Sequence, residues 1–262
     1  MDWLNSLPAG VLVAGWLALA LLFAAGSRLM VGALVPADDH DSVQGVASPL
    51  MPALGAAFAV LTALTLSSEA GYLRAAQDLV SNEATAASRL AWAATSPGVD
   101  TAPIHEALTV YLQRTRANEW RDASAVEGDP ETGRAIAGLE RTVRTEAART
   151  ELGTPASSEL LMSLDALTSG RRARAATADR AIPVLYVITL VASGAALVGN
   201  AGALAFRTRL RTSLLVMGLA VVVGLSLALL FALSAPWRGS LIVSGQPIDA
   251  IIRDLQAGFF GT

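Results

Sequence analysis

Side chains suited to catalysis are scarce in this chain and are not spaced for it. The two histidines, His40 and His105, lie far apart, and neither has a second metal ligand at helical spacing. The chain has no Cys, which excludes disulfides, thiolate nucleophiles and Cys-ligated metals. It also lacks the sequence motifs of serine hydrolases, zinc proteases, phosphate-binding loops and dinucleotide-binding domains. We therefore expect a protein that is not an enzyme and has no cofactor.

One acidic loop has the residue types of a cation site. It contains four consecutive polar residues, Asp38, Asp39, His40 and Asp41, whose oxygen atoms could bind a divalent cation. A solvated loop between two helices explains the same residues more simply. We therefore predict a polar loop there and no metal site.

Glu83 is the most informative charged residue, because it interrupts an apolar seam. The seam has the three- and four-residue spacing of a coiled coil and consists of Tyr72, Ala76, Leu79, Glu83, Ala86 and Leu90. A buried carboxylate without a partner costs several kcal/mol, so a cationic partner is expected. The sequence offers an arginine cluster for this role, Arg171, Arg172 and Arg174.

We favour a structural role for these charges. The predicted buried ion-pair network consists of Glu83, Glu119, Arg171, Arg172 and Arg174, with Arg114 or Arg116 as substitute partners. The alternative is a ring of Glu83 carboxylates along a permeation path.

A polar stripe lies where the second apolar run ends. It consists of Thr62, Thr65, Ser68, Glu69 and Tyr72. Hydroxyl groups on membrane helices commonly bond to their own backbone, but a pore made by this helix in an oligomer would need such a stripe. These five are therefore our candidate pore-lining residues. If ions pass through such a pore, apolar constrictions and weak dipoles would have to control their passage.

Four long uncharged stretches must position these residues. They cover residues 3–27, 42–68, 181–206 and 212–237. A bilayer core about 30 Å thick needs roughly 20 apolar residues per helix. The net charge of −3 gives no sign of nucleic-acid binding. We therefore predict an all-α, polytopic protein of the cell membrane with four transmembrane helices, the lipid bilayer as partner and no nucleic acid. The first stretch is too long for a cleaved signal peptide.

Four regions follow from this pattern. They are a first transmembrane helix pair (1–68), a helical extramembrane module (69–180), a second pair (181–237) and a tail with a short amphipathic helix (238–262). The second transmembrane helix should begin near Pro49 and Pro52 and continue without a break into the module. In the tail, Ile248, Ile251, Ile252 and Leu255 share one side, and we favour docking on the module over the lipid headgroup layer.

Helix starts within the module are marked by Thr101 with Pro103, by Asp129-Pro130 and by Thr154-Pro155. The apolar faces predicted for these three helices consist of Ile104, Leu108, Tyr111, Leu112 and Thr115, then Ile136, Leu139, Val143 and Ala147, then Leu160, Leu161, Leu164 and Leu167. Small residues four apart also form contact faces on the first two membrane helices, including Gly10 and Gly55.

The order of these parts resembles the bestrophin-like bacterial membrane proteins, a family defined by a domain of unknown function. The resemblance covers almost the whole chain. Its motifs are His40-Asp41 before a Gly- and Ala-rich helix, Glu83-Ala84, Tyr111 followed by Glu119-Trp120, Arg171-Arg172-x-Arg174, and Pro236-Trp237-Arg238-Gly239. The chain departs from the family pattern at Asp41-Ser42 and at Ala235.

The resemblance implies architecture and, by analogy with bestrophins, a homo-oligomeric anion-channel-like assembly. The alternative is a non-conducting scaffold or accessory subunit that associates with partner membrane subunits.

The side of the membrane that holds the module is left open. Three arginines in the short loop 207–211, with Arg28, place that loop in the cytoplasm and the module outside. Arg171, Arg172, Arg174 and Arg180 and the bestrophin analogy place the module inside.

Overall fold

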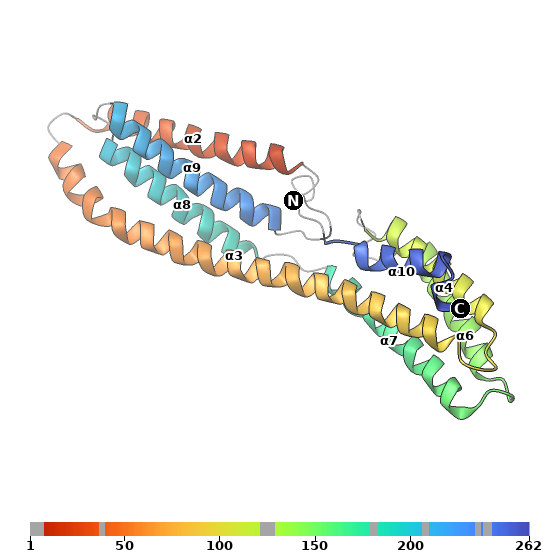
Figure 1. Cartoon of the computed structure of the whole chain (residues 1–262). Coiled ribbons are helices and arrows are strands. Elements are labelled where there is room, and N and C mark those ends of the chain that lie inside the picture. Colours follow the sequence, from red (N-terminus) through yellow and green to blue (C-terminus); the bar gives the residue numbers. More distant parts are fainter. Residues whose placement is uncertain are drawn as a thin grey trace. The chain divides into compact units, whose positions relative to one another are not determined.

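The protein is helical throughout the part that the structure describes (Figure 1). This computed structural model describes residues 8–36, 40–120, 129–178, 183–205, 210–233, 237 and 243–261. Four of its helices are long and apolar enough to cross a membrane, which agrees with the predicted all-α, four-span fold class. The chain divides into two compact units. The first comprises Met1–Gly71, Ala181–Ala235 and Gly239–Leu241, and the second comprises Tyr72–Arg180, Pro236–Arg238 and Ile242–Thr262.

The first unit is built from apolar helices. They are α2 (Ala9–Leu34), the first part of α3 (His40–Ala93), α8 (Val184–Ala205) and α9 (Leu210–Leu233). Helix α2 packs against α8 and α9, and α8 packs against α9. Their shared core includes Ala24, Phe58, Leu190, Leu197, Ala201, Ala220, Val223 and Leu230.

Glycines permit close helix contacts in this unit. A Cβ atom on Gly224 of α9 would lie 3.1 Å from the backbone carbonyl oxygen of Trp16 on α2. A Cβ atom on Gly194 of α8 would lie 3.1 Å from the Phe58 ring. By contrast, no neighbouring atom lies within 4 Å of the Cβ positions of Gly10 and Gly55. The predicted faces at these two glycines are therefore open in the single chain.

Helix α3 begins earlier than predicted. It starts at His40, so Pro49 and Pro52 lie inside the helix and not at its first turn. A proline in a membrane helix is tolerated when neighbouring groups contribute new hydrogen bonds. In the same region, Nδ2 of Asn200 on α8 donates a hydrogen bond to the carbonyl oxygen of Ala47 at 2.9 Å. The expected start near the prolines was wrong, because residues 40–48 precede Pro49 in the same helix and an apolar helix tolerates an internal proline.

The second unit contains the rest of α3 and the shorter helices. These are α4 (Thr101–Asn118), α6 (Pro130–Ala147), α7 (Thr154–Ala178), α10 (Gln246–Gln256) and the 3-10 turn η2 (Phe259–Gly261). The Asp129 side chain caps α6 by accepting a 2.7 Å hydrogen bond from the Thr132 amide. Hydrogen bonds from Asn118 and from that amide lower the pKa of the Asp129 carboxyl. The helix starts predicted at Thr101, Pro130 and Thr154 are thus confirmed.

The core of this unit follows the predicted faces with one exception. The faces of α4 and α6 are buried as expected. On α7, Leu160, Leu164 and Leu167 are buried, whereas Leu161 is 39% exposed. Adjacent residues on a helix point about 100° apart, so Leu161 falls beside the buried face. Helix α10 packs against α4, and Ile248 is completely buried in the same core.

Candidate functional site

A buried ion pair joins α3 and α7 within the second unit. Glu83 has no exposed surface and Arg174 is 1% exposed. The Arg174 Nε donates to Glu83 Oε2 at 2.5 Å, and the Tyr111 hydroxyl donates to Glu83 Oε1 at 2.5 Å. Both carboxylate oxygens of Glu83 therefore have a buried donor.

Arg174 also bonds to a second carboxylate. Its Nη2 donates to Glu119 Oε2 at 2.7 Å, and Arg171 Nη2 donates to Glu119 Oε1 at 2.6 Å. The backbone amide of Asp129 donates to the same Glu119 oxygen at 3.3 Å. We call Glu83, Tyr111, Glu119, Arg171 and Arg174 the buried cluster. Its two carboxylates balance its two guanidinium groups, which limits the cost of burying charge.

Burial and charge shift the titration of two members of the cluster. Burial, followed by the charge of Glu83, raises the pKa of the Tyr111 hydroxyl well above its usual value. Burial alone would lower the pKa of Arg174, but the carboxylate of Glu83 more than offsets this and raises it. Arg174 is therefore a permanent cation and Tyr111 a hydrogen-bond donor at neutral pH.

Local sequence explains how the cluster forms. The seam spacing of α3 turns Glu83 inward with Ala76 and Leu90 as predicted, but Val80 is buried beside them in place of Leu79, which is only partly buried. Gly170 lies one turn before Arg174, and a Cβ atom there would be 3.4 Å from the Cα of Glu83. The missing side chain lets α7 approach α3 closely enough for the guanidinium to contact the carboxylate.

The structure brings together most of the predicted network. Glu83, Glu119, Arg171 and Arg174 are in contact, whereas Arg172 is exposed. The proposed substitutes have other partners. Arg114 pairs with Glu131 at the surface at 2.6 Å, and Arg116 pairs with Asp249 at 2.9 Å.

Tyr111 belongs to the cluster although the sequence placed it on an apolar face and in a family motif, and not in the ion-pair network. A signal for its role was present in the sequence, because the hydroxyl of a buried tyrosine usually needs a hydrogen-bond partner. Tyr111 and Glu83 are 28 residues apart, and no local pattern pairs residues at that separation.

The members of the polar stripe do not share one environment. Thr62, Glu69 and Tyr72 are buried, and Ser68 is exposed. Thr65 Oγ1 donates back to the carbonyl oxygen of Leu61 at 2.7 Å, the local bond that membrane helices favour. In the second unit, the Tyr72 hydroxyl donates to the carbonyl oxygen of Thr177.

The predicted acidic loop is described only in part. Asp38 and Asp39 lie outside the described residues, and His40 and Asp41 lie in the first turn of α3. In the part of the chain that the structure describes, no group of three or more His, Asp and Glu side chains could hold a metal ion.

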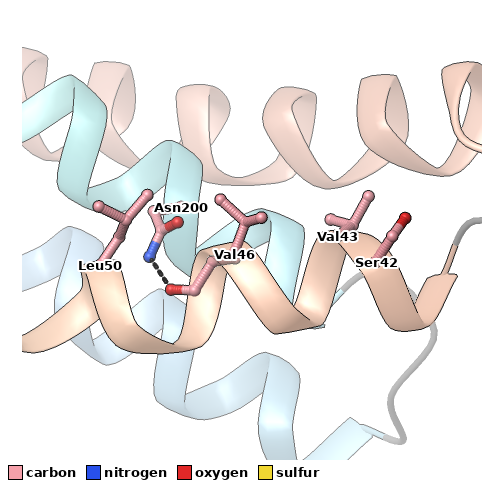
Figure 2. Close-up of a pocket in the computed structure, with 6 residues that line it drawn as sticks. Ser42, Val43, Val46, Leu50 and Asn200 are labelled. Atoms are coloured by element: carbon pink, nitrogen blue, oxygen red, sulfur yellow. Dashed lines mark hydrogen bonds between the residues drawn. The ribbon is translucent and has the colours of Figure 1, made fainter.

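An open groove lies in the first unit beside Asn200 (Figure 2). One face of α3 forms most of it, and its lining consists of Ser42, Val43, Val46, Ala47, Leu50 and Asn200. The Asn200 side chain bonds to the α3 backbone across this groove. The lining is almost entirely apolar and carries no group for acid–base chemistry.

The buried cluster supports a structural interpretation. Each carboxylate oxygen of Glu83 and Glu119 already accepts a hydrogen bond from a cluster side chain, which argues against a role as a general base or as a ligand. A carboxylate neutralised by a guanidinium also presents little charge to a passing ion.

Comparisons with known proteins agree with this architecture. Residues 18–248 match the family model of the bestrophin-like domain. No curated protein matches the sequence. The fold is similar to the crystal structure of a bacterial bestrophin homologue from Klebsiella pneumoniae, with a TM-score of 0.73, 14% identity and coverage of 94% of this chain and 97% of that one.

Two further crystal structures have the same fold. A point mutant of the Klebsiella pneumoniae homologue gives a TM-score of 0.71 at 14% identity and covers 93% of this chain and 99% of its own. A second mutant, described only as a membrane protein, gives 0.74 at 14% identity and covers 95% and 99%. At this identity the structures establish a common fold, and the family is established by the domain match. This chain, with its four apolar helices and its helical second unit, belongs to the bestrophin-like family of membrane proteins.

Proposed function

We propose that this protein forms a homo-oligomeric, anion-channel-like assembly in the cell membrane, with four helices crossing the bilayer and no enzymatic activity. The observation that carries the proposal is the bestrophin-like domain match over residues 18–248. The step from family to conduction rests on analogy, and the residues of α3 make it testable.

Helix α3 supports an assembly of several copies. It is the least buried of the four candidate spans, and Val60 and Leu64 on it are 58% and 66% exposed. The open surface around Gly55 lies on the same helix. Small residues without internal neighbours allow another helix to pack closely, so a second copy could lie against this face.

Ser68 is the stripe residue that we assign to a pathway. It is exposed, whereas Thr62 and Glu69 are buried inside the chain. Copies arranged around an axis could turn Ser68 toward a shared pore, where its hydroxyl would supply a weak dipole. The other stripe residues would then support the pore wall from behind.

A non-conducting scaffold is the second candidate function. The uncharged stretches 3–27, 42–68, 181–206 and 212–237 favour it, because coupled transport and steep ion selectivity usually require ionisable groups in the membrane. A scaffold would use the open faces at Gly10 and Gly55 for partner subunits instead of further copies.

Planar-bilayer recording of the purified protein in a chloride gradient separates the two. A channel gives discrete currents with an anion-selective reversal potential, and Ser68→Leu lowers their amplitude. Thr65→Val is the matched control, since the Thr65 hydroxyl already bonds to Leu61. Absent conductance, with stable recovery of the protein alongside another membrane complex, would support the scaffold.

Oligomer size in detergent gives an independent test. Gly55→Leu places a large side chain on an open face and should shift the assembly toward smaller species. Gly138→Ala, on a helix of the second unit with no atom near its Cβ position, serves as a control that leaves the size unchanged.

A further inference from the structure

The C-terminal tail is held on the second unit by a specific set of polar contacts. By tail we mean the described residues 243–261. Gln77 of α3 exchanges two hydrogen bonds with the Ser244 backbone, accepting from the amide at 2.9 Å and donating to the carbonyl at 3.3 Å. The Trp120 indole Nε1 donates to the carbonyl oxygen of Val243 at 2.9 Å. These bonds hold residues 243–244, which precede α10, against the second unit.

Arg116 of α4 binds the tail helix itself. Its Nε donates to both carboxylate oxygens of Asp249, at 2.9 and 3.1 Å. Gly245 makes this possible, because a Cβ atom at that position would overlap the Arg116 guanidinium. The docked tail also buries Ile248 completely and leaves Phe260 only 3% exposed.

Trp120 is shared between the tail contacts and the buried cluster. The Arg116 guanidinium carbon lies 5.3 Å from the centroid of the Trp120 ring, and that of Arg174 lies 5.5 Å from it. Arg116 is the partner of Asp249 in the tail, whereas Arg174 is the partner of Glu83 and Glu119 in the cluster. Trp237 packs edge-on against the same ring. One side chain therefore contacts the cations of both networks.

We propose that Trp120 couples docking of the C-terminal tail to the integrity of the buried cluster, so that the two form and open together. When Asp249 is lost, Arg116 shifts and its guanidinium group leaves the Trp120 ring. The Trp120 side chain, whose indole nitrogen also bonds to Val243, is then held less firmly. The ring then no longer holds Arg174 between Glu83 and Glu119. The coupling makes the tail a control element of the second unit, and it does not depend on whether the protein conducts ions.

Hydrogen exchange on the full-length protein in detergent tests the coupling in both directions. Asp249→Asn should speed amide exchange in α10 about tenfold and also speed it in the last turns of α7, because local opening releases both. Glu83→Gln should speed exchange in α7 and also in α10. Gly245→Ala should also speed exchange in α10 and in the last turns of α7, because its methyl group displaces Arg116 while the Asp249 charge is kept.

The control variant is Glu131→Gln, which breaks the exposed pair with Arg114 and should leave exchange in α7 and α10 unchanged. A double-mutant cycle of Asp249→Asn and Glu83→Gln, followed by thermal unfolding, gives the deciding measurement. Side chains that share no partner add their effects. Non-additive losses support the coupling, and additive losses, with α7 exchange unchanged in Asp249→Asn, overturn it.

Trp120 variants identify the coupling residue. Trp120→Phe retains an aromatic face for both arginines and should preserve non-additivity, whereas Trp120→Leu should abolish it. If Trp120→Leu does not fold, the cycle in the Trp120→Phe background decides, since additivity there would overturn the role of the aromatic ring.

Discussion

Glu83 is the residue on which the second unit most depends. It is completely buried and bonds to Arg174 and Tyr111. Removing one member of a buried pair leaves the other charge unpaired, a loss of typically about 3–5 kcal/mol. We predict that Glu83→Ala lowers stability by this amount in thermal unfolding in detergent, at unchanged oligomer size.

Glu131→Ala is the matched control for that prediction. Glu131 lies in the first turn of α6 and pairs with Arg114 where both side chains are 53% exposed. A surface pair and a helix-dipole contact each contribute about 1 kcal/mol or less. Equal losses for the two variants would contradict the structural role of Glu83. A gain in stability for Glu83→Ala would instead favour a ring of like charges.

Tyr111 predicts how stability depends on pH. Its raised pKa means that the folded protein retains a proton that the unfolded chain releases near pH 10. Its contribution is therefore fully present below about pH 10 and is lost as the pH rises further. The chain has no Lys and no Cys and has three tyrosines, so few other groups titrate there.

The measurement is unfolding free energy against pH in the alkaline range. Tyr111→Phe should reduce the downward slope above pH 10 by about 1.4 kcal/mol per pH unit, the value for one proton. It should also lower stability at neutral pH, because the Glu83 oxygen loses a buried donor. An unchanged alkaline slope would show that Tyr111 ionises in the folded state.

Sequence reasoning identified the charges of the cluster but not their pairing. Seam spacing along α3 was sufficient to bury Glu83, because periodicity fixes which side of a helix faces its neighbours. The choice of Arg174 over Arg172 depends on the rotation of α7 about its axis, which is fixed by Gly170 against Glu83. The pairing of Arg116 with Asp249 joins residues 133 apart, a separation at which no sequence spacing predicts contact.

At the level of elements, glycine spacing determines how closely the apolar helices pack. Gly224 and Gly218 lie on the same helix, α9, but differ in surroundings. A methyl group on Gly224 would press against the Trp16 carbonyl oxygen and the Leu17 Cα of α2, whereas one on Gly218 meets no atom. The absence of a side chain therefore allows close contact between α9 and α2 at Gly224, whereas Gly218 makes no such contact.

We predict opposite effects for the two alanine variants. Gly224→Ala should destabilise the first unit by about 1–3 kcal/mol, the usual cost of overpacking. Gly218→Ala should be neutral or stabilising by up to about 1 kcal/mol, because alanine is the better helix former. Thermal unfolding of the two proteins in the same detergent measures the difference. Loss of stability in Gly218→Ala alone would contradict the packing of α9 on α2.

The elements also show where prediction from sequence fails. Four membrane helices were expected from the uncharged stretches, and the described residues include four helices long and apolar enough to cross a membrane, because bilayer thickness constrains length and composition. Proline is common at helix starts, so Pro49 and Pro52 predict the start of α3 near them, whereas the helix in fact begins earlier. Only the folded structure shows that the turns before Pro49 belong to the same helix.

At the scale of the whole molecule, the number of crossings fixes which parts share a side of the membrane. If all four candidate helices cross, the module and the segment between α8 and α9 are separated by a single span. A reporter inserted near Ala125 and another within residues 207–211 must then report opposite compartments. Identical sidedness would mean that α8 does not cross.

The same pair of reporters decides which compartment the module occupies. The sequence has Arg207, Arg209 and Arg211 in the short segment between the third and fourth apolar stretches. Positive charge has most influence on orientation in such short segments, and these arginines predict that this one is cytoplasmic. The arginines near the end of α7 and the bestrophin analogy predict a cytoplasmic module instead. A fusion whose activity requires the cytoplasm, placed near Ala125, distinguishes the two. Replacing the three arginines of this short segment with glutamine should reverse the orientation only if their charges determine it, and an unchanged result would assign control to the arginines that flank the module.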